Sequence, residues 1–160
     1  RGITFGGGNV YVAEAGSGGA TATTAAQCPQ VVPPVGPYTS GRTSRISRIG
    51  PHGNRSTLAF NFPSSINAFG DVIGVADVAF IGPQLYALVS GGGCSHGSRG
   101  VPAGIAKVSP DGHWSIVANL SAFQRSHPVA QPFAGDFEPD GTWFSMRVIH
   151  GIIFAVERGP

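Results

Sequence analysis

Residues 1–16 read RGITFGGGNVYVAEAG, and they align without gaps with residues 76–91, ADVAFIGPQLYALVSG. In this alignment Tyr11 meets Tyr86, and each copy reads as a strand, a glycine-containing turn and a second strand. A third copy, FSMRVIHGIIFAVERG, covers residues 144–159. Self-similarity of this kind indicates a repeat architecture, in which one supersecondary unit recurs along the chain.

A second repeated segment follows the first. Residues 45–59, RISRIGPHGNRSTLA, align with residues 104–118, GIAKVSPDGHWSIVA. Each copy predicts a hairpin with a Pro-x-Gly turn, because proline presets the first turn position and glycine tolerates a positive φ after it. The connection before this hairpin is longer in the first copy (17–43) than in the second (92–103). Repeat proteins commonly vary by such loop insertions.

An inner strand pair, a variable loop and an outer hairpin together form the plan of a propeller blade. We therefore predict an all-β fold, a β-propeller of four-stranded blades with about two and a half blades and an incomplete ring. Blade 1 covers about residues 1–62, blade 2 about 74–123, and the start of blade 3 about 137–160. Consecutive apolar residues at 10–13 fit a strand buried on both faces. The alternative is a β-sandwich, in which apolar and polar residues would alternate along each strand and this repeat would be absent.

The composition favours short strands and tight turns. Of 160 residues, 25 are glycine and 13 are proline, while 41% are hydrophobic and only 11% are charged, unlike a disordered tail. The net charge of +2 is too small to indicate a nucleic-acid partner. Arg42, Arg45 and Arg48 form a short basic run, but Arg45 and Arg48 point to opposite faces of a strand, so we expect a solvated surface. No apolar run is long enough for a membrane span.

The two cysteines, Cys28 and Cys94, both lie in the loop after the inner strands of consecutive blades. Equivalent loops leave the same face of a ring, so we predict a disulfide; two free buried thiols are the alternative. An even pair of cysteines with few charges also favours a secreted, extracellular protein. Asn54 and Asn119 begin Asn-x-Ser triplets, which matter as glycosylation sites only in a eukaryotic secretory source.

Two groups of carboxylates are candidates for ligand binding. Glu14 and Glu157 share one repeat position at the end of an inner strand, where both could face the mouth of a ring. Asp136, Glu138 and Asp140 alternate in sequence and could offer oxygen ligands to Ca²⁺. Against a metal, Pro-Asp-Gly is a turn in which the Asp140 carboxylate is expected to bond its own backbone. We therefore assign no metal or cofactor, with Ca²⁺ as the alternative at these three residues.

Residues 93–97, GCSHG, match the Gly-x-Ser-x-Gly nucleophile elbow of α/β-hydrolases. The elbow requires a helix after the serine, whereas the following residues read as a loop, so we assign no catalytic residue. The histidines are scattered and form no pair at metal-ligand spacing, which predicts surface positions for all of them. These are His52, His96, His113, His127 and His150.

Several segments resemble the ScyD/ScyE-like propellers, a bacterial family named for its link to scytonemin biosynthesis. They are residues 1–5 (RGITF), 10–16 (VYVAEAG), 77–80 (DVAF), 85–88 (LYAL) and 136–146 (DFEPDGTWFSM). The resemblance covers about the first half of such a protein. It implies a six-bladed, mostly secreted propeller whose biochemical activity is largely undefined.

From these observations we expect a secreted, non-enzymatic propeller that acts as a binding module or as a structural subunit. An incomplete ring leaves an apolar blade face open at each end, so other copies or further blades are the expected partners. The alternative is a metal-assisted hydrolase, similar to the lactonase-type propellers, with Glu14 and Glu157 in the channel mouth. The sequence does not indicate which small ligand would bind at this channel mouth.

Overall fold

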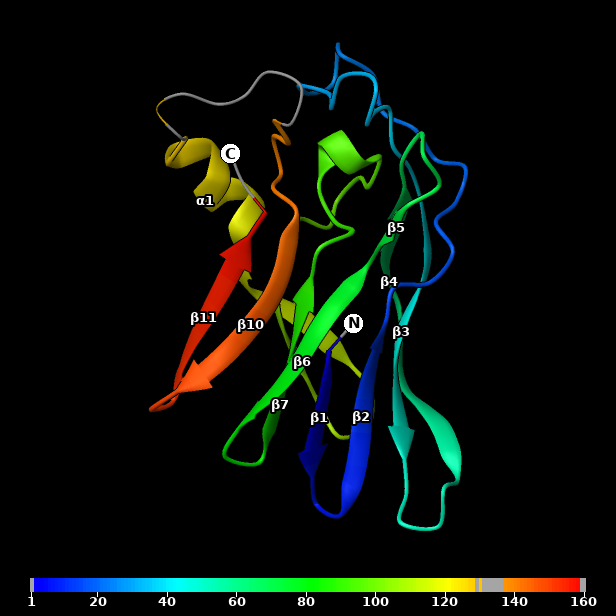
Figure 1. Ribbon diagram of the computed structural model, residues 1–160, viewed down its shortest axis with the longest axis vertical. Helices are drawn as coiled ribbons and strands as arrows, with labels where there is room; N and C mark the ends of the chain where they lie inside the picture. The colour runs from blue at the N-terminus through cyan, green and yellow to red at the C-terminus, as the bar shows by residue number, and fades with distance from the viewer. Residues whose placement is uncertain (1, 129, 131–136, 159–160) are drawn as a thin grey trace.

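The computed structural model describes residues 2–128, 130 and 137–158, and its regular structure is mostly strand (Figure 1). The strands form three antiparallel sheets of five, four and two strands, in each of which neighbours in sequence are neighbours in the sheet. The predicted all-β class is therefore confirmed. None of the helices in the described part of the chain has the length and apolar character that a bilayer crossing requires.

The first sheet has the order β1-β2-β3-β4-β5. Its strands are β1 (Ile3–Gly6), β2 (Asn9–Glu14), β3 (Thr39–Ile49), β4 (Arg55–Ile66) and β5 (Val72–Ile73). The turn between β3 and β4 is closed by hydrogen bonds from Gly50 N to Asn54 O and from Gly53 N to Gly50 O. This is the hairpin that the Pro-x-Gly segment at residues 45–59 predicts.

The second sheet has the order β6-β7-β8-β9, and the third contains only β10 and β11. The strands are β6 (Val75–Ile81), β7 (Gln84–Val89), β8 (Gly104–Val108), β9 (Trp114–Asn119), β10 (Trp143–Ile149) and β11 (Ile152–Glu157). A short 3₁₀ turn, η1 (Cys94–His96), lies between β7 and β8, and α1 (Leu120–Ser126) follows β9. The Asn119 side chain accepts a hydrogen bond from Ala122 N at 2.8 Å and caps α1.

The first two strands of each sheet form a hairpin with the same two-residue turn. The last paired residues are Gly6 with Asn9, Ile81 with Gln84, and Ile149 with Ile152. A turn this tight needs positive φ, the region that suits glycine. The residues with positive φ in these turns are Gly7, Gly8, Gly82, His150 and Gly151.

The second sheet lies between the other two (Figure 1), and its strand β7 is covered on both faces. Along β7, Leu85, Ala87 and Val89 pack with residues of the first sheet in one core cluster. Leu88, with Tyr86 packed beside it, belongs to a second cluster formed with the β10–β11 hairpin. Because both faces are covered, β7 is apolar at consecutive positions.

The outer two sheets each keep one apolar face uncovered. The first open face consists of Ile3 and Phe5 on β1, which are 56% and 71% exposed, and their cross-strand partners on β2. The second open face lies on the β10–β11 hairpin. Its residues, 48–65% exposed, are Phe144, Ile149, Ile152, Phe154 and Val156.

Candidate functional site

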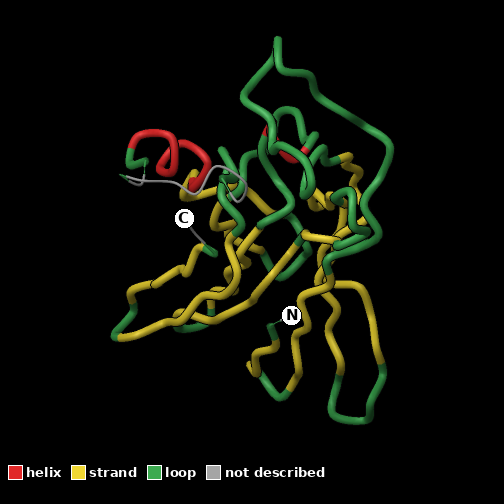
Figure 2. The backbone as a smooth tube through the Cα atoms, turned by 45° about the horizontal axis from the view of Figure 1, so that its top comes forward, coloured by secondary structure: helices red, strands yellow, loops and turns green. Residues whose placement is uncertain are grey.

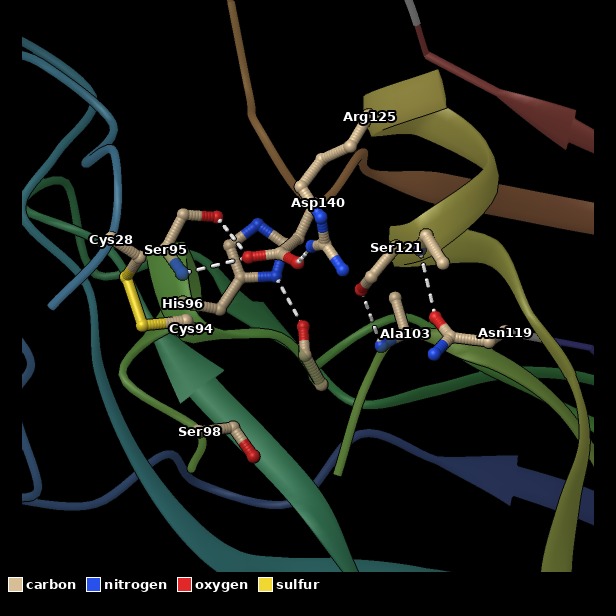
Figure 3. Close-up of polar contacts among 12 residues, drawn as sticks. Cys28, Cys94, Ser95, His96, Ser98, Ala103, Asn119, Ser121, Arg125 and Asp140 are labelled. Carbon is tan, nitrogen blue, oxygen red and sulfur yellow. Dashed lines mark hydrogen bonds and ion pairs between the residues drawn. A yellow bond between two sulfur atoms is a disulfide. The ribbon is translucent and has the colours of Figure 1, made fainter. Parts of the chain in front are cut away.

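Three loops meet at one end of the molecule (Figure 2). They are the connection after β2 (residues 15–38), the connection after β7 (90–103) and the segment before β10 (137–142). The structure joins Cys28 of the first loop to Cys94 of the second in a disulfide, the pairing that the sequence predicts. The Thr23 hydroxyl donates to the Cys94 carbonyl at 2.6 Å beside it. The polar cluster described next lies beside this disulfide (Figure 3).

The η1 turn carries two residues of the polar cluster, Ser95 and His96. Glycines flank the turn, and Gly93 has φ 102°. A β-carbon on Gly93 would lie 2.3 Å from Cγ of Asp140, so both the backbone angle and the packing require glycine here. The glycines of the Gly-x-Ser-x-Gly pattern thus bring the turn against Asp140.

Asp140 is 2% exposed, and hydrogen bonds surround its carboxylate. Oδ2 accepts from both the backbone N and the hydroxyl of Ser95, each at 2.7 Å, and Oδ1 accepts from Nη1 of Arg125 at 3.0 Å (Figure 3). Burial would raise the pKa of Asp140, but the Ser95 hydrogen bonds and the nearby His96 charge outweigh burial and lower this pKa. Asp140 is therefore an ionised carboxylate in the interior.

His96 is fully buried, and both of its ring nitrogens face acceptors. Nδ1 lies 2.8 Å from the Gly92 carbonyl, and Nε2 lies 3.1 Å from Oε2 of Glu138. Burial would lower the pKa of His96, but the hydrogen bond and charge of Glu138 and the charge of Asp140 raise it. Since a carbonyl and a carboxylate both accept, the geometry fits the imidazolium form of His96, which donates from both nitrogens.

Glu138 is held on two sides besides His96. The Tyr38 hydroxyl donates to Oε1 at 3.1 Å, and the Thr142 hydroxyl donates to Oε2. The Tyr38 ring also packs on the His96 ring with 4.8 Å between centroids. Burial and the Glu138 charge raise the pKa of Tyr38, so it stays protonated as a donor. The buried cluster of Tyr38, His96 and Glu138 thus ties the first loop to the third.

This geometry does not activate Ser95 as a nucleophile. Ser95 is 1% exposed, and its hydroxyl donates to the Asp140 carboxylate. Both ring nitrogens of the neighbouring His96 already face other acceptors, so neither is placed to accept the Ser95 proton. A shallow groove of about 410 Å³ does open beside the cluster. Its walls include Arg125, Asp140 and Ser121.

The other predicted carboxylates lie apart from this cluster or at its margin. Glu14 accepts from Ser47 and pairs with Arg45 at 2.9 Å and Arg55 at 2.5 Å. Burial would raise the pKa of Glu14, but the Ser47, Arg45 and Arg55 hydrogen bonds lower it. Two arginines therefore already neutralise this carboxylate. Glu157 accepts from Thr142 N at 3.3 Å.

The alternating carboxylates do not act together in the described residues. Asp136 lies outside those residues, while Glu138 and Asp140 bind different partners, His96 and Ser95. Over residues 2–128, 130 and 137–158, no cluster of three or more metal-ligating side chains occurs. The expected backbone bond of the Asp140 carboxylate is wrong, because the turn directs it to Ser95 and Arg125 instead.

The surface position predicted for His96 is also wrong. No sequence signal distinguishes it from the exposed histidines, since its partner Glu138 lies 42 residues away. Tyr38, Ser95, Arg125 and Thr142 were likewise not predicted as members of the cluster. Of the two Asn-x-Ser triplets, Asn54 is exposed, whereas the triplet at Asn119 caps α1 and its Ser121 is 1% exposed.

No family model, curated protein or solved structure matches this chain in comparisons with known proteins.

Proposed function

We propose that the chain is part of a secreted, non-enzymatic β-propeller of the ScyD/ScyE-like kind, and that it acts as a binding and assembly module. In this proposal the first sheet is one blade, the second sheet is the next, and the β10–β11 hairpin begins a third. The shared register of the three hairpins supports this arrangement. The function then resides in the two open faces.

The observation that carries the proposal is the equivalence between buried and open positions. Between the first two sheets, Tyr11 packs edge-on against Phe80 with 5.1 Å between ring centroids. By register, Phe154 stands where Tyr11 stands, and Phe5 stands where Phe80 stands. The two open faces therefore present the two halves of a contact that the molecule already makes internally. A head-to-tail neighbour of the same architecture fits both faces.

The polar cluster supports a binding role over a catalytic one. Each charged group in it is used by a partner inside the protein, and Glu14 is used by two arginines. Such groups fasten the loops to one another through contacts inside the protein. The disulfide between Cys28 and Cys94 supports an oxidising, extracellular location.

Sedimentation of the purified chain tests this proposal. At micromolar concentration the wild type should associate through its open faces, whereas Phe5→Ser and Phe154→Ser should each shift it towards monomer. Phe69→Ser is the matched control, because Phe69 is 65% exposed but lies in the β4–β5 loop, away from both faces. A compact wild-type monomer whose sedimentation none of these substitutions changes would contradict the proposal.

A further inference from the structure

A pocket of about 290 Å³ lies between the first two sheets. Strands β2, β3 and β4 of the first sheet supply one wall, and β6, β7 and β8 of the second sheet supply the other. Pro83, in the turn between β6 and β7, places the pocket at the end of the molecule opposite the three loops (Figure 1). The pocket therefore lies away from both the polar cluster and the β10–β11 hairpin.

The walls of this pocket are largely apolar, and the core holds them in place. Leu85 and Val108 belong to the core cluster between the first two sheets, and Leu58 and Phe80 pack against that cluster. A β-carbon on Gly6 would lie 2.5 Å from Cε2 of Phe80, so the absence of a side chain on Gly6 lets the ring lie against β1. The pocket is thus already formed without a ligand, as small-molecule sites usually are.

Among the described residues that line the pocket, Arg48 is the only charged one. It pairs with Tyr11 across β3 and β2, and directly paired residues share a face of the sheet. Ile46, two residues earlier on β3, lies on this same face and is fully buried in the core cluster. A cation therefore lies on the face of the first sheet that packs against the second sheet.

The guanidinium of Arg48 has no ion-pair partner in the described part of the chain. Its neighbours differ in this respect, because Arg45 and Arg55 both pair with Glu14, and Arg45 lies on the opposite face of β3. Arg48 is exposed, and an arginine in such a place rests its stem on apolar surface and keeps its head in water. The charge at the opening of the pocket is thus available to an anion from outside.

The other polar groups of the pocket favour the same kind of ligand. Nε2 of Gln84 already donates to the carbonyls of Leu85 and Val108, at 2.9 and 2.7 Å. Tyr11 and Ser109 add hydroxyl groups to the lining, and the described lining residues include no carboxylate that would repel an anion.

The volume of the pocket limits the size of the ligand. A dry cavity of about 150 Å³ takes one benzene molecule. The pocket between the sheets, at about 290 Å³, therefore has room for a fused two-ring body.

We propose that this pocket binds a small aromatic carboxylate, with its ring body between the two sheets and its carboxylate on Arg48. The fork of a guanidinium matches the two oxygens of a carboxylate, and Tyr11 and Phe80 offer aromatic surface to the ring. The site goes beyond the proposed function and does not depend on it, since neither Phe5 nor Phe154 lines the pocket.

The test uses the full chain and 2-naphthoate as the probe. Titration followed by methyl NMR should show saturable binding, with the largest shifts at Leu58, Leu85 and Val108. The neutral analogue 2-naphthamide has the same rings without the charge, so it should bind more weakly by about tenfold or more. Acetate, which has the charge without the rings, should show no saturable binding.

Substitution of Arg48 separates the charge from the apolar walls. Arg48→Met keeps a long side chain and removes the charge, so it should weaken binding of 2-naphthoate by about tenfold or more and leave binding of 2-naphthamide unchanged. Arg48→Lys keeps the charge without the fork and should give an intermediate affinity.

Lys107→Met is the matched control. Lys107 faces Tyr86 across β8 and β7 as Arg48 faces Tyr11, but it does not line the pocket. Lys107 and Arg48 are both exposed, so both variants should fold, and Lys107→Met should bind 2-naphthoate as the wild type does.

Four results would each overturn the proposal. The first is a failure of 2-naphthoate to reach saturation at millimolar concentration. The second is equal affinity for 2-naphthoate and 2-naphthamide. The third is binding that Arg48→Met leaves unchanged or that Lys107→Met weakens equally. The fourth is a set of shifts centred on Val117 and Ile153, which would place the ligand in the apolar groove beside α1 instead.

Discussion

At the scale of single residues, the buried charges explain how three loops with little regular structure hold one arrangement. His96 and Glu138 form one pair, and Arg125 and Asp140 form another, so the cluster is balanced in charge. A buried ion that loses its partner is costly, since the remaining charge keeps its desolvation penalty. The protonation state of His96 is therefore coupled to folding.

Replacement of His96 by Gln tests this coupling. The folded pKa of His96 is raised above 6.5, so its stabilisation is fully present below about pH 6.5 and is lost as pH rises through the folded value. At neutral pH, His96→Gln should lower the free energy of unfolding by about 3 kcal/mol. The difference from the wild type should shrink at higher pH. Urea unfolding of both proteins at several pH values measures this difference in the free energy of unfolding.

The control for this measurement is His113→Gln. The His113 side chain is 90% exposed, so this variant should follow the wild-type profile. A His96→Gln variant with wild-type stability across the neutral and alkaline range would show that the pair with Glu138 contributes nothing.

Residue-level prediction from the sequence succeeds only where the signal is local or chemically unique. The cysteines are the only two in the chain, so a pairing between them could be proposed from their places in successive repeats. The Pro-Asp-Gly turn predicts a local backbone bond for Asp140, whereas its partner Ser95 lies 45 residues away. A long-range contact between single polar residues leaves no periodicity in the sequence, so nothing in the sequence separates His96 from the surface histidines.

At the scale of elements, the disulfide joins the longest connection to the rest of the fold. Residues 17–38 contain little regular structure, and the isolated bridge from Thr21 to Ser40 is their main ladder contact. Cys28 and Cys94 are separated by 66 positions, so their bond restricts a large part of the unfolded chain. The chain-entropy model gives about 4 kcal/mol for a loop of this size.

Removing both sulfurs should lower the free energy of unfolding by about 2 to 4 kcal/mol. In Cys28→Ser combined with Cys94→Ser, limited proteolysis should cut first between Thr24 and Val35, because the loop keeps few other attachments. The double variant serves as its own control, since a reducing agent should destabilise the wild type and leave the variant unaffected. Equal stability of oxidised and reduced wild type would contradict this account.

The hairpins were the best-predicted elements because their turn chemistry and strand pattern agree. Pro110, Gly112 and the flanking apolar residues place one outer turn correctly, and glycines mark the inner turns. The α1 helix was not predicted, although Asn119 begins it as an N-cap, because seven residues carry too short a periodic signal. The loops were predicted only as loops.

At the scale of the whole molecule, protection from solvent is uneven because the sheets are covered unequally. The second sheet has a neighbour on each face, whereas the β10–β11 hairpin is packed on one face through Met146 and Trp143. Local opening requires less free energy where fewer apolar contacts must separate. The hairpin should therefore open without unfolding of the rest.

Hydrogen exchange under native conditions should show this order directly. Amides of β7 and β8 should exchange slowest, near the rate set by global unfolding, and amides that join β10 to β11 should exchange faster through local opening. Met146→Ala removes packing between the hairpin and the second sheet, so it should speed exchange most in β10 and β11 and much less in β7 and β8, which keep their contacts with the first sheet. Val78→Ala, in the cluster between the first two sheets, should speed exchange in both sheets. If Met146→Ala instead raised exchange equally in β7 and β11, the hairpin and the second sheet would open as one unit, and the open face of the hairpin would be fixed in place rather than free to adapt to a neighbour.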